Sequence, residues 1–386
     1  MFYTIPKDII SLATLEYLGF DGFAAADIWR RWTNWPSESA VKRETDDCIH
    51  GMPFIDFATG HLASKRQFDT DDQDDQLWSD CLDQCGIGAQ LQMAIMDPAL
   101  RKIRLTESCL YWVEDSILLR HRGLEQVQRA SRDGAKHLQR TRTRPDASSA
   151  DTSQPSISAT MGMAPGISHD TAMSQAALAA ANSPGSITLY KAIDQAHLAG
   201  MFNDAGEVVD ISPLFSKDCA TDFMSRESGL YFAVDRDIAE YYACYAKRRG
   251  GVNSVAIVQV AISESAIESL SDTELIRTYW PSTEWKNLVF HCRKRQKLPH
   301  PLRKFKQAKL IIGTIASKPN FVYERMHDPE QVVERMVLKN RDGRNAVQYA
   351  FNDYQGDDFF QEHAVPSIKV FPLTAVELDE WLENRR

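Results

Sequence analysis

The chain has 386 residues, of which 43% are hydrophobic, 10% are aromatic and 25% are charged. This length is sufficient for two domains, each with its own hydrophobic core. The formal net charge of -9 argues against a protein that mainly neutralises phosphate backbones, so nucleic acid is not the expected partner.

The amino-terminal segment and the apolar runs predict a protein of the cell interior. The first eight residues, MFYTIPKD, lack the basic and apolar regions of a secretion signal, and no apolar run reaches the about 18 residues that cross a membrane. The seven cysteines are an odd number scattered along the chain, unlike a secreted disulfide framework. We therefore expect an intracellular protein, cytoplasmic or nuclear, with no membrane partner.

Residues 1–140 carry helical periodicity and are expected to form an α-helical region. Residues 9–18 place apolar side chains at helical spacing and stop at Gly19, and a second helix is expected to begin near Asp21 and to end before Pro36. We interpret the tryptophans of this hairpin as core residues, the alternative being a partner-binding groove. Its second helix has few side chains suited to base edges, which disfavours DNA reading.

Three polar features of this region are interpreted as structural. Cys81 and Cys85 would face one side of a helix, but no nearby Cys/His pair completes a zinc site, so no metal is expected. The acidic run 69–75 lacks the glycine and the terminal glutamate of an EF-hand loop and is expected to be solvated. The basic residues of 120–140 are interpreted as the solvated face of a helix, the alternative being an acidic partner.

Residues 141–186 differ in composition from the rest of the chain. They are rich in Ser, Ala, Thr, Pro and Gly and almost free of large apolar residues. Such a segment cannot bury enough surface to offset its conformational entropy. It is expected to be a disordered linker.

Residues 187–386 are expected to form a second, α+β domain of packed small β-sheets with flanking helices. The expected strands are 186–192, 206–211, 229–234, 254–262, 308–315, 345–351 and 367–371, and the expected helices are 237–247 and 285–296. No G-x-G-x-x-G segment follows a strand, which argues against a Rossmann cofactor site. The basic stretch 293–309 is interpreted as solvated, the alternatives being an acidic partner or a pyrophosphate.

The segment 229–233, Gly-Leu-Tyr-Phe-Ala, predicts a strand that leads into a helix. Tyr231 lies on the strand, and Tyr242 follows eleven residues later on the helix. Two aromatic rings in this arrangement could stack on a flat ligand ring. The alternative is that both fill the core, as aromatic residues of a half-buried strand and a helix commonly do.

Two further short segments, one before and one after this strand, belong to the same pattern. Thr188-Leu189-Tyr190-Lys191 precedes it, and Val347-Gln348-Tyr349 follows it. In this order the segments resemble the ADP-ribosyltransferase-like superfamily over roughly residues 187–371, both its His-Tyr-Glu branch and a related, poorly characterised family. Lys191 and Gln348 stand where that branch has histidine and glutamate, and Tyr231 stands at its tyrosine.

The resemblance implies NAD as the substrate and no metal. It implies catalytic roles for Tyr231, Gln348 and Lys191, and contacts with NAD from Lys191, Tyr231 and Tyr242. The implied reaction is mono-ADP-ribosyl transfer to an unknown acceptor, expected to be a protein, or hydrolysis of NAD.

Two departures from the family pattern leave an alternative open. Gln348 lacks the charge of a glutamate, although its amide oxygen can accept a hydrogen bond from a ribose hydroxyl, and Lys191 adds a point charge. The alternative is a degenerate module that binds NAD, ADP-ribose or a protein without turnover, with the N-terminal helices selecting the partner.

Overall fold

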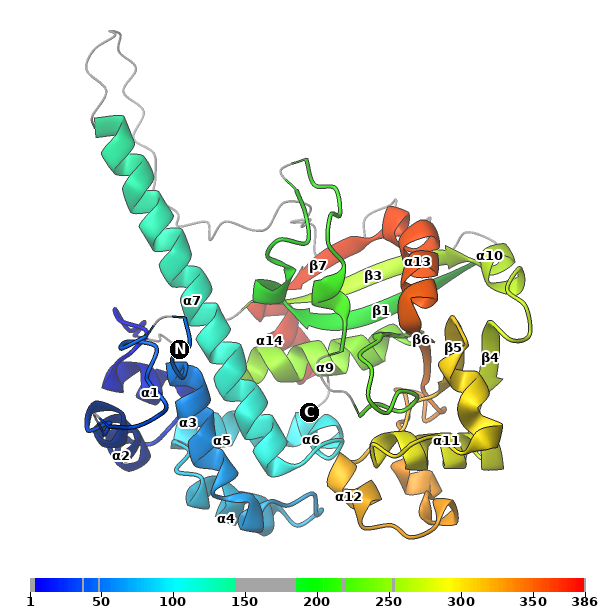
Figure 1. Ribbon diagram of the computed structural model, residues 1–386, viewed down its shortest axis with the longest axis horizontal. Coiled ribbons are helices and arrows are strands. Elements are labelled where there is room, and N and C mark those ends of the chain that lie inside the picture. The colour runs from blue at the N-terminus through cyan, green and yellow to red at the C-terminus, as the bar shows by residue number, and fades with distance from the viewer. Residues whose placement is uncertain are drawn as a thin grey trace, which may run out of the picture.

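The computed structural model describes residues 4–142 and 185–384, apart from residues 37, 48, 204, 217–219 and 252–253 and the side chains of 133–142 and 353. In this part the chain has the expected α+β composition, with N-terminal helices beside one seven-stranded sheet (Figure 1). The segment predicted as a disordered linker, 141–186, lies almost entirely outside the described residues.

The N-terminal region is helical, as predicted. Its helices are α1 (Leu12–Leu18), α2 (Gly22–Thr33), α3 (Phe54–Ala63), α4 (Asp75–Gln84), α5 (Ala89–Ile95), α6 (Arg101–Arg104) and α7 (Cys109–Arg142). Gly19 ends α1 with a φ of 119°, a left-handed conformation that glycine adopts at little cost. Trp32 of α2 is buried against Phe54 and Phe57, so its interpretation as a core residue is confirmed.

Asp21 caps α2, because its side chain accepts a hydrogen bond of 2.7 Å from the backbone N–H of Ala24. We expect Asp21→Ala to lower the free energy of unfolding by about 1 kcal/mol, since the first turn then loses an acceptor. Asp21→Asn is the matched control and should stay within a few tenths of a kcal/mol. Urea unfolding followed by circular dichroism measures both, and equal losses in the two variants would contradict the capping role.

The interpretation of the basic residues of α7 as a solvated face was wrong at Arg120 and Arg122, whereas Arg129 and Arg132 are exposed. Arg120 is buried, and its guanidinium donates to the carbonyl oxygens of Arg249 (2.8 Å) and Tyr17 (3.1 Å). Arg122 forms an ion pair of 2.8 Å with Asp194 of the sheet. The side chains of Arg120 and Arg122 therefore bind backbone and carboxylate groups of the elements packed against α7, which periodicity alone could not reveal.

The sheet is continuous, so the prediction of several small sheets was wrong. Its strands are β1 (Ser186–Asp194), β2 (Leu230–Ala233), β3 (Val255–Ser263), β4 (Leu275–Thr278), β5 (Leu310–Thr314), β6 (Val347–Phe351) and β7 (Lys369–Leu373). Their order is β4-β5-β6-β2-β1-β3-β7; β4 and β5 pair in parallel, and the other neighbours pair antiparallel. The short β2 joins the two halves, because it pairs with β1 on one side and β6 on the other.

Two strand predictions differ from the structure. Residues 206–211 form no strand; a single bridge joins Phe202 to Val208 around a turn at Gly206, whose φ is 81°. Strand β4 was not predicted, because its four residues give too short an apolar pattern.

Helices cover both faces of the sheet. They are α9 (Arg236–Arg249), α10 (Glu264–Glu268), α11 (Thr283–Arg293), α12 (Asn320–Glu324), α13 (Asp353–His363) and α14 (Ala375–Glu383). Phe360 of α13 stacks on Phe232 on one face. On the other face α9 packs over β1 and β3, and α11 packs over β5 and β6.

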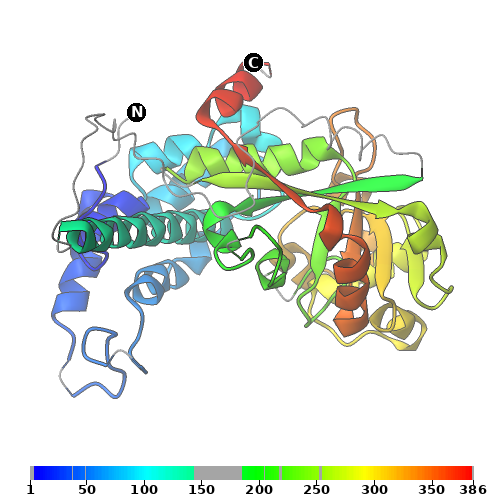
Figure 2. The same ribbon diagram turned by 90° about the horizontal axis from the view of Figure 1, so that it is seen from above.

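The N-terminal helices and the sheet share a hydrophobic core. Tyr241, Cys244 and Tyr245 of α9 cluster with apolar side chains of α1 to α7, and the Tyr245 hydroxyl donates to the carbonyl oxygen of Ile95 (3.2 Å). Figure 2 shows α9 between the N-terminal helices and the strands.

Within the described residues no helix is long and apolar enough to cross a membrane.

Candidate functional site

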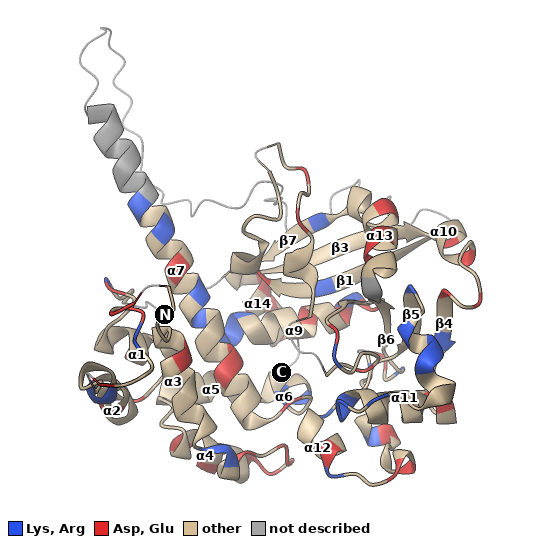
Figure 3. Cartoon of the chain, viewed as in Figure 1, with Lys and Arg blue, Asp and Glu red and all other residues tan. Residues whose placement is uncertain are grey.

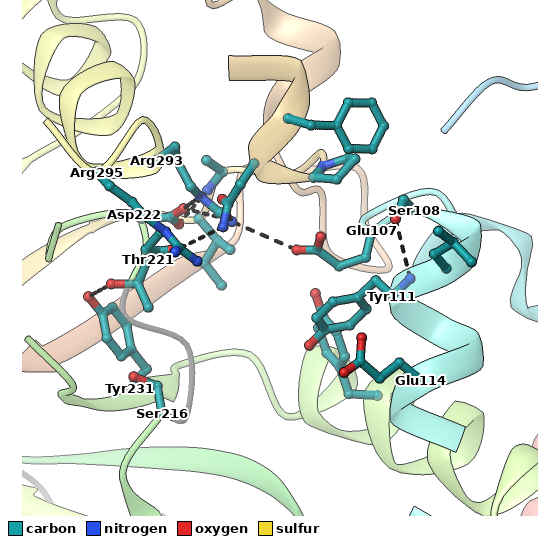
Figure 4. A pocket seen from close by; sticks show the side chains of 18 of the residues that line it. Glu107, Ser108, Tyr111, Glu114, Ser216, Thr221, Asp222, Tyr231, Arg293 and Arg295 are labelled. Carbon is teal, nitrogen blue, oxygen red and sulfur yellow. Dashed lines mark hydrogen bonds and ion pairs between the residues drawn. The ribbon is translucent and has the colours of Figure 1, made fainter. Parts of the chain in front are cut away.

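A cleft of about 1120 Å³ opens over β2 and β6, on the face that carries α9 and α11. Figure 4 shows Thr221, Asp222, Tyr231, Arg293 and Arg295 on one wall. The opposite wall comes from the start of α7 and the residues before it, with Glu107, Ser108, Tyr111 and Glu114. The cleft is therefore formed jointly by the sheet and the N-terminal region.

All four residues singled out in the sequence line this cleft. Lys191 comes from β1, Tyr231 from β2, Tyr242 from α9 and Gln348 from β6. Strands β1, β2 and β6 are neighbours in the sheet, and Ala233 of β2 lies opposite Gln348. Because side chains alternate along a strand, Tyr231 and Gln348 project from the same face.

Lys191 reaches the cleft from the other face. In the described residues β1 and β2 share a single pair of Cα partners, Tyr190 and Ala233, and then separate. Lys191 follows Tyr190, so its side chain starts on the opposite face from Tyr231. Its Nζ nevertheless donates a hydrogen bond of 3.2 Å to the carbonyl oxygen of Tyr231, at the place where the two strands part.

The Tyr231 ring is held on its wall by polar and aromatic neighbours. Its hydroxyl forms a hydrogen bond with Oγ1 of Thr221, and its ring lies 6.5 Å from that of Phe223 at an interplanar angle of 33°. Burial raises the pKa of Tyr231, so the phenol stays neutral at physiological pH. The ring is thus a fixed, uncharged surface.

Tyr242 packs against the apolar core of the N-terminal helices. Burial raises the pKa of Tyr242 to about 12, although a hydrogen bond with Thr106 opposes the shift. No ring contact joins Tyr231 and Tyr242 in the described part of the chain. The two aromatic side chains line one cleft without forming a stacked pair.

Asp222, which the sequence did not single out as a site residue, lies at the centre of the site's hydrogen-bond network. It is 4% exposed, and its carboxylate accepts hydrogen bonds from three groups. Arg293 Nε donates to Oδ1 (2.8 Å), and Oδ2 receives the backbone N–H of Ala316 (2.8 Å) and Nε2 of Gln348 (2.6 Å). Because a carboxylate is an acceptor, the amide nitrogen of Gln348 must face Asp222, which leaves its amide oxygen for other donors.

Arg293 links this network to both walls. Its Nη1 donates to Oδ1 of Asn320 (3.0 Å) and lies 3.7 Å from Oε1 of Glu107. Burial opposes the charge of Arg293, but Asp222, Tyr323 and Glu107 together outweigh burial and raise the pKa of the guanidinium. The interpretation of 293–309 as a solvated basic stretch was therefore wrong at Arg293, where the charge is paired inside the protein.

Arg295 occupies an unusual backbone position at the mouth of the cleft. It follows the end of α11 with a φ of 55°, and its N–H donates to the carbonyl oxygen of Cys292 (2.9 Å). Glycine is the usual residue here, and another side chain costs about 1 kcal/mol or more. Within the described residues its guanidinium, which is exposed, has no carboxylate partner. Figure 3 shows acidic and basic residues interspersed over the described part of the chain.

The partly buried side chain of Lys191 gives the free energy of unfolding a pH dependence. Burial lowers the pKa of Lys191 from 10.5 to about 8. Between these values the unfolded chain binds a proton that the folded chain does not, so stability should rise with pH, by at most about 1.4 kcal/mol per pH unit. Lys191→Met should lose this rise. Urea unfolding of both proteins across this pH range measures the difference, and parallel pH profiles would contradict it.

The site defines a class only in broad terms: an α+β protein with a polar cleft built on three adjacent strands and closed by a helical region. No group of three or more His, Cys, Asp or Glu side chains in the described part could hold a metal ion. Comparisons with family models, curated proteins and solved structures found no match.

Proposed function

We propose that the cleft binds NAD and that the chain is an NAD-dependent mono-ADP-ribosyltransferase or NAD glycohydrolase. The observation that carries this proposal is that Lys191, Tyr231 and Gln348 come from three adjacent strands to one cleft. Their order along the chain is the one on which the resemblance to ADP-ribosyltransferases rests. A cleft of about 1120 Å³ is also large enough for a dinucleotide.

In this proposal each residue has a chemical task. The neutral ring of Tyr231 offers a stacking surface for nicotinamide. The amide oxygen of Gln348, left free by the bond to Asp222, accepts a hydrogen bond from a ribose hydroxyl. Arg295 at the mouth offers a cation to the diphosphate. Nicotinamide leaves, and water or a nucleophile of an acceptor, proposed to be a protein, takes the ADP-ribosyl group.

A second candidate is binding of NAD or ADP-ribose, or of a protein, without turnover. It is favoured by the pairing of Asp222, the carboxylate bonded to Gln348, with Arg293. Since β6 presents glutamine at this position, it offers the reacting ribose no free carboxylate to stabilise a developing oxocarbenium ion. Loss of one such electrostatic group costs about 3 kcal/mol of transition-state stabilisation.

One experiment separates the two candidates. The purified chain is incubated with NAD that carries label in both the nicotinamide and the adenosine parts, and release, transfer and equilibrium binding are measured together. Release of nicotinamide supports the enzyme, and binding without release supports the binding module. A chain that neither binds nor cleaves NAD would overturn both.

A further inference from the structure

We propose that Lys191 is itself an acceptor of ADP-ribose, so that the chain modifies its own cleft in a single turnover. This inference rests on the proposed function, because the ADP-ribosyl group comes from NAD. It assigns to Lys191 a role as nucleophile rather than as a contact for ribose or phosphate.

The position of Lys191 is the first argument. Its Nζ is held 3.2 Å from the carbonyl oxygen of Tyr231, the residue whose ring is proposed to stack on nicotinamide. It also lies 5.9 Å from the ring centre of Phe232, at the gap where β1 and β2 separate. Lys191 thus lines the cleft that is proposed to bind NAD.

The second argument is the charge around the amine. Among the described residues no carboxylate forms an ion pair with Lys191, whereas Arg293 in the same cleft is paired with Asp222 at 2.7 Å. Burial lowers the pKa of Lys191 to about 8, so about a tenth of the side chain is uncharged at neutral pH. An ordinary lysine carries about a thousandth or less of the nucleophilic form.

The reaction balances without a metal or an oxidant. The lone pair of Nζ forms a bond to the anomeric carbon of the ribose that carries nicotinamide. The bond between this carbon and the nicotinamide nitrogen breaks, and its electron pair neutralises the pyridinium ring. The new secondary ammonium group on Lys191 can lose its extra proton to water. A good nucleophile is useful here, since Gln348 cannot stabilise a fully developed cation as a carboxylate would.

The test is to incubate the full chain with NAD, to measure the nicotinamide released per chain, and to map the product by mass spectrometry. We expect one equivalent of nicotinamide and one ADP-ribosyl group on the peptide that contains Lys191. Lys191→Arg, which keeps the charge but removes the nucleophile, should bind NAD without forming this adduct. Lys309→Arg is the matched control and should form it, since Lys309 pairs with Glu274 outside the cleft.

A second arm needs no NAD and isolates the inference from the proposed function. A small amine-reactive ester at neutral pH should modify Lys191 at least about tenfold faster than the ion-paired Lys309. Equal rates would overturn the inference. Continued release of nicotinamide from a chain with unmodified Lys191 would also overturn it while leaving the proposed function standing. The ester can also react selectively with Lys191 while NAD neither binds to the chain nor reacts with it. In that case the proposed function is contradicted, and so is the transfer of ADP-ribose to Lys191.

Discussion

Tyr231→Ala is expected to weaken NAD binding about 100-fold and to reduce nicotinamide release to the background rate. The ring is the only aromatic side chain that β2 directs into the cleft on the face shared with Gln348, in the part of the chain that the structure describes. Removal of a central tyrosine from a binding site costs about 2–4 kcal/mol, and about 2.7 kcal/mol corresponds to the 100-fold loss. Calorimetric titration with NAD and a nicotinamide release assay measure the two effects.

Tyr231→Phe is the matched control for this prediction. It keeps the ring and removes only the hydrogen bond to Thr221, which is worth about 1 kcal/mol. Its affinity should therefore stay within about tenfold of the native value. Because Tyr231 also packs against the core under α11, thermal unfolding of both variants must accompany the titration. An alanine variant that folds and binds NAD as well as the phenylalanine variant would contradict the stacking role.

Arg293→Met is expected to cause the largest loss of stability, about 3–5 kcal/mol. The methionine would fill similar space but leave the carboxylate of Asp222, which is 4% exposed, without its cationic partner. Breaking a buried ion pair on one side is costly because the remaining charge has no compensation. The free energy of unfolding from urea titration provides the measurement.

The double variant Arg293→Met with Asp222→Asn separates charge from packing. It removes the stranded carboxylate, so it should recover a large part of the stability lost in the single variant. An asparagine amide has one acceptor oxygen where the carboxylate has two, so recovery should be incomplete. A single variant that loses less than about 1 kcal/mol would show that Asp222 is not held by Arg293.

The helices and most strands could be predicted because their signals are local. Asp21 and Gly19 mark the ends of adjacent helices through bonds within one turn, and the alternating pattern around Tyr231 needs only its neighbours in sequence. Continuity of the sheet could not be predicted in this way. It depends on β2 pairing with β6, which lies more than 100 residues further along the chain.

In the candidate site, too, some residues could be predicted from local sequence and others could not. Lys191, Tyr231 and Gln348 stand out because motifs of a few residues surround each of them, and their order suffices to suggest a common cleft. Asp222 and Glu107 carry no such local signal for their roles. Their importance comes from Arg293, which pairs with Asp222 and approaches Glu107 at 3.7 Å.

Local residue patterns are thus sufficient for the helical region, the aromatic strand and the candidate residues, since caps, periodicity and short motifs act within a few residues. Three features depend on the tertiary structure: the burial of Arg120 and the pairing of Arg293, the single sheet, and the wall supplied by the N-terminal helices. Whether an arginine is solvated or paired is set by which segments pack against it, and the core shared by α7 and α9 brings together groups more than 100 residues apart.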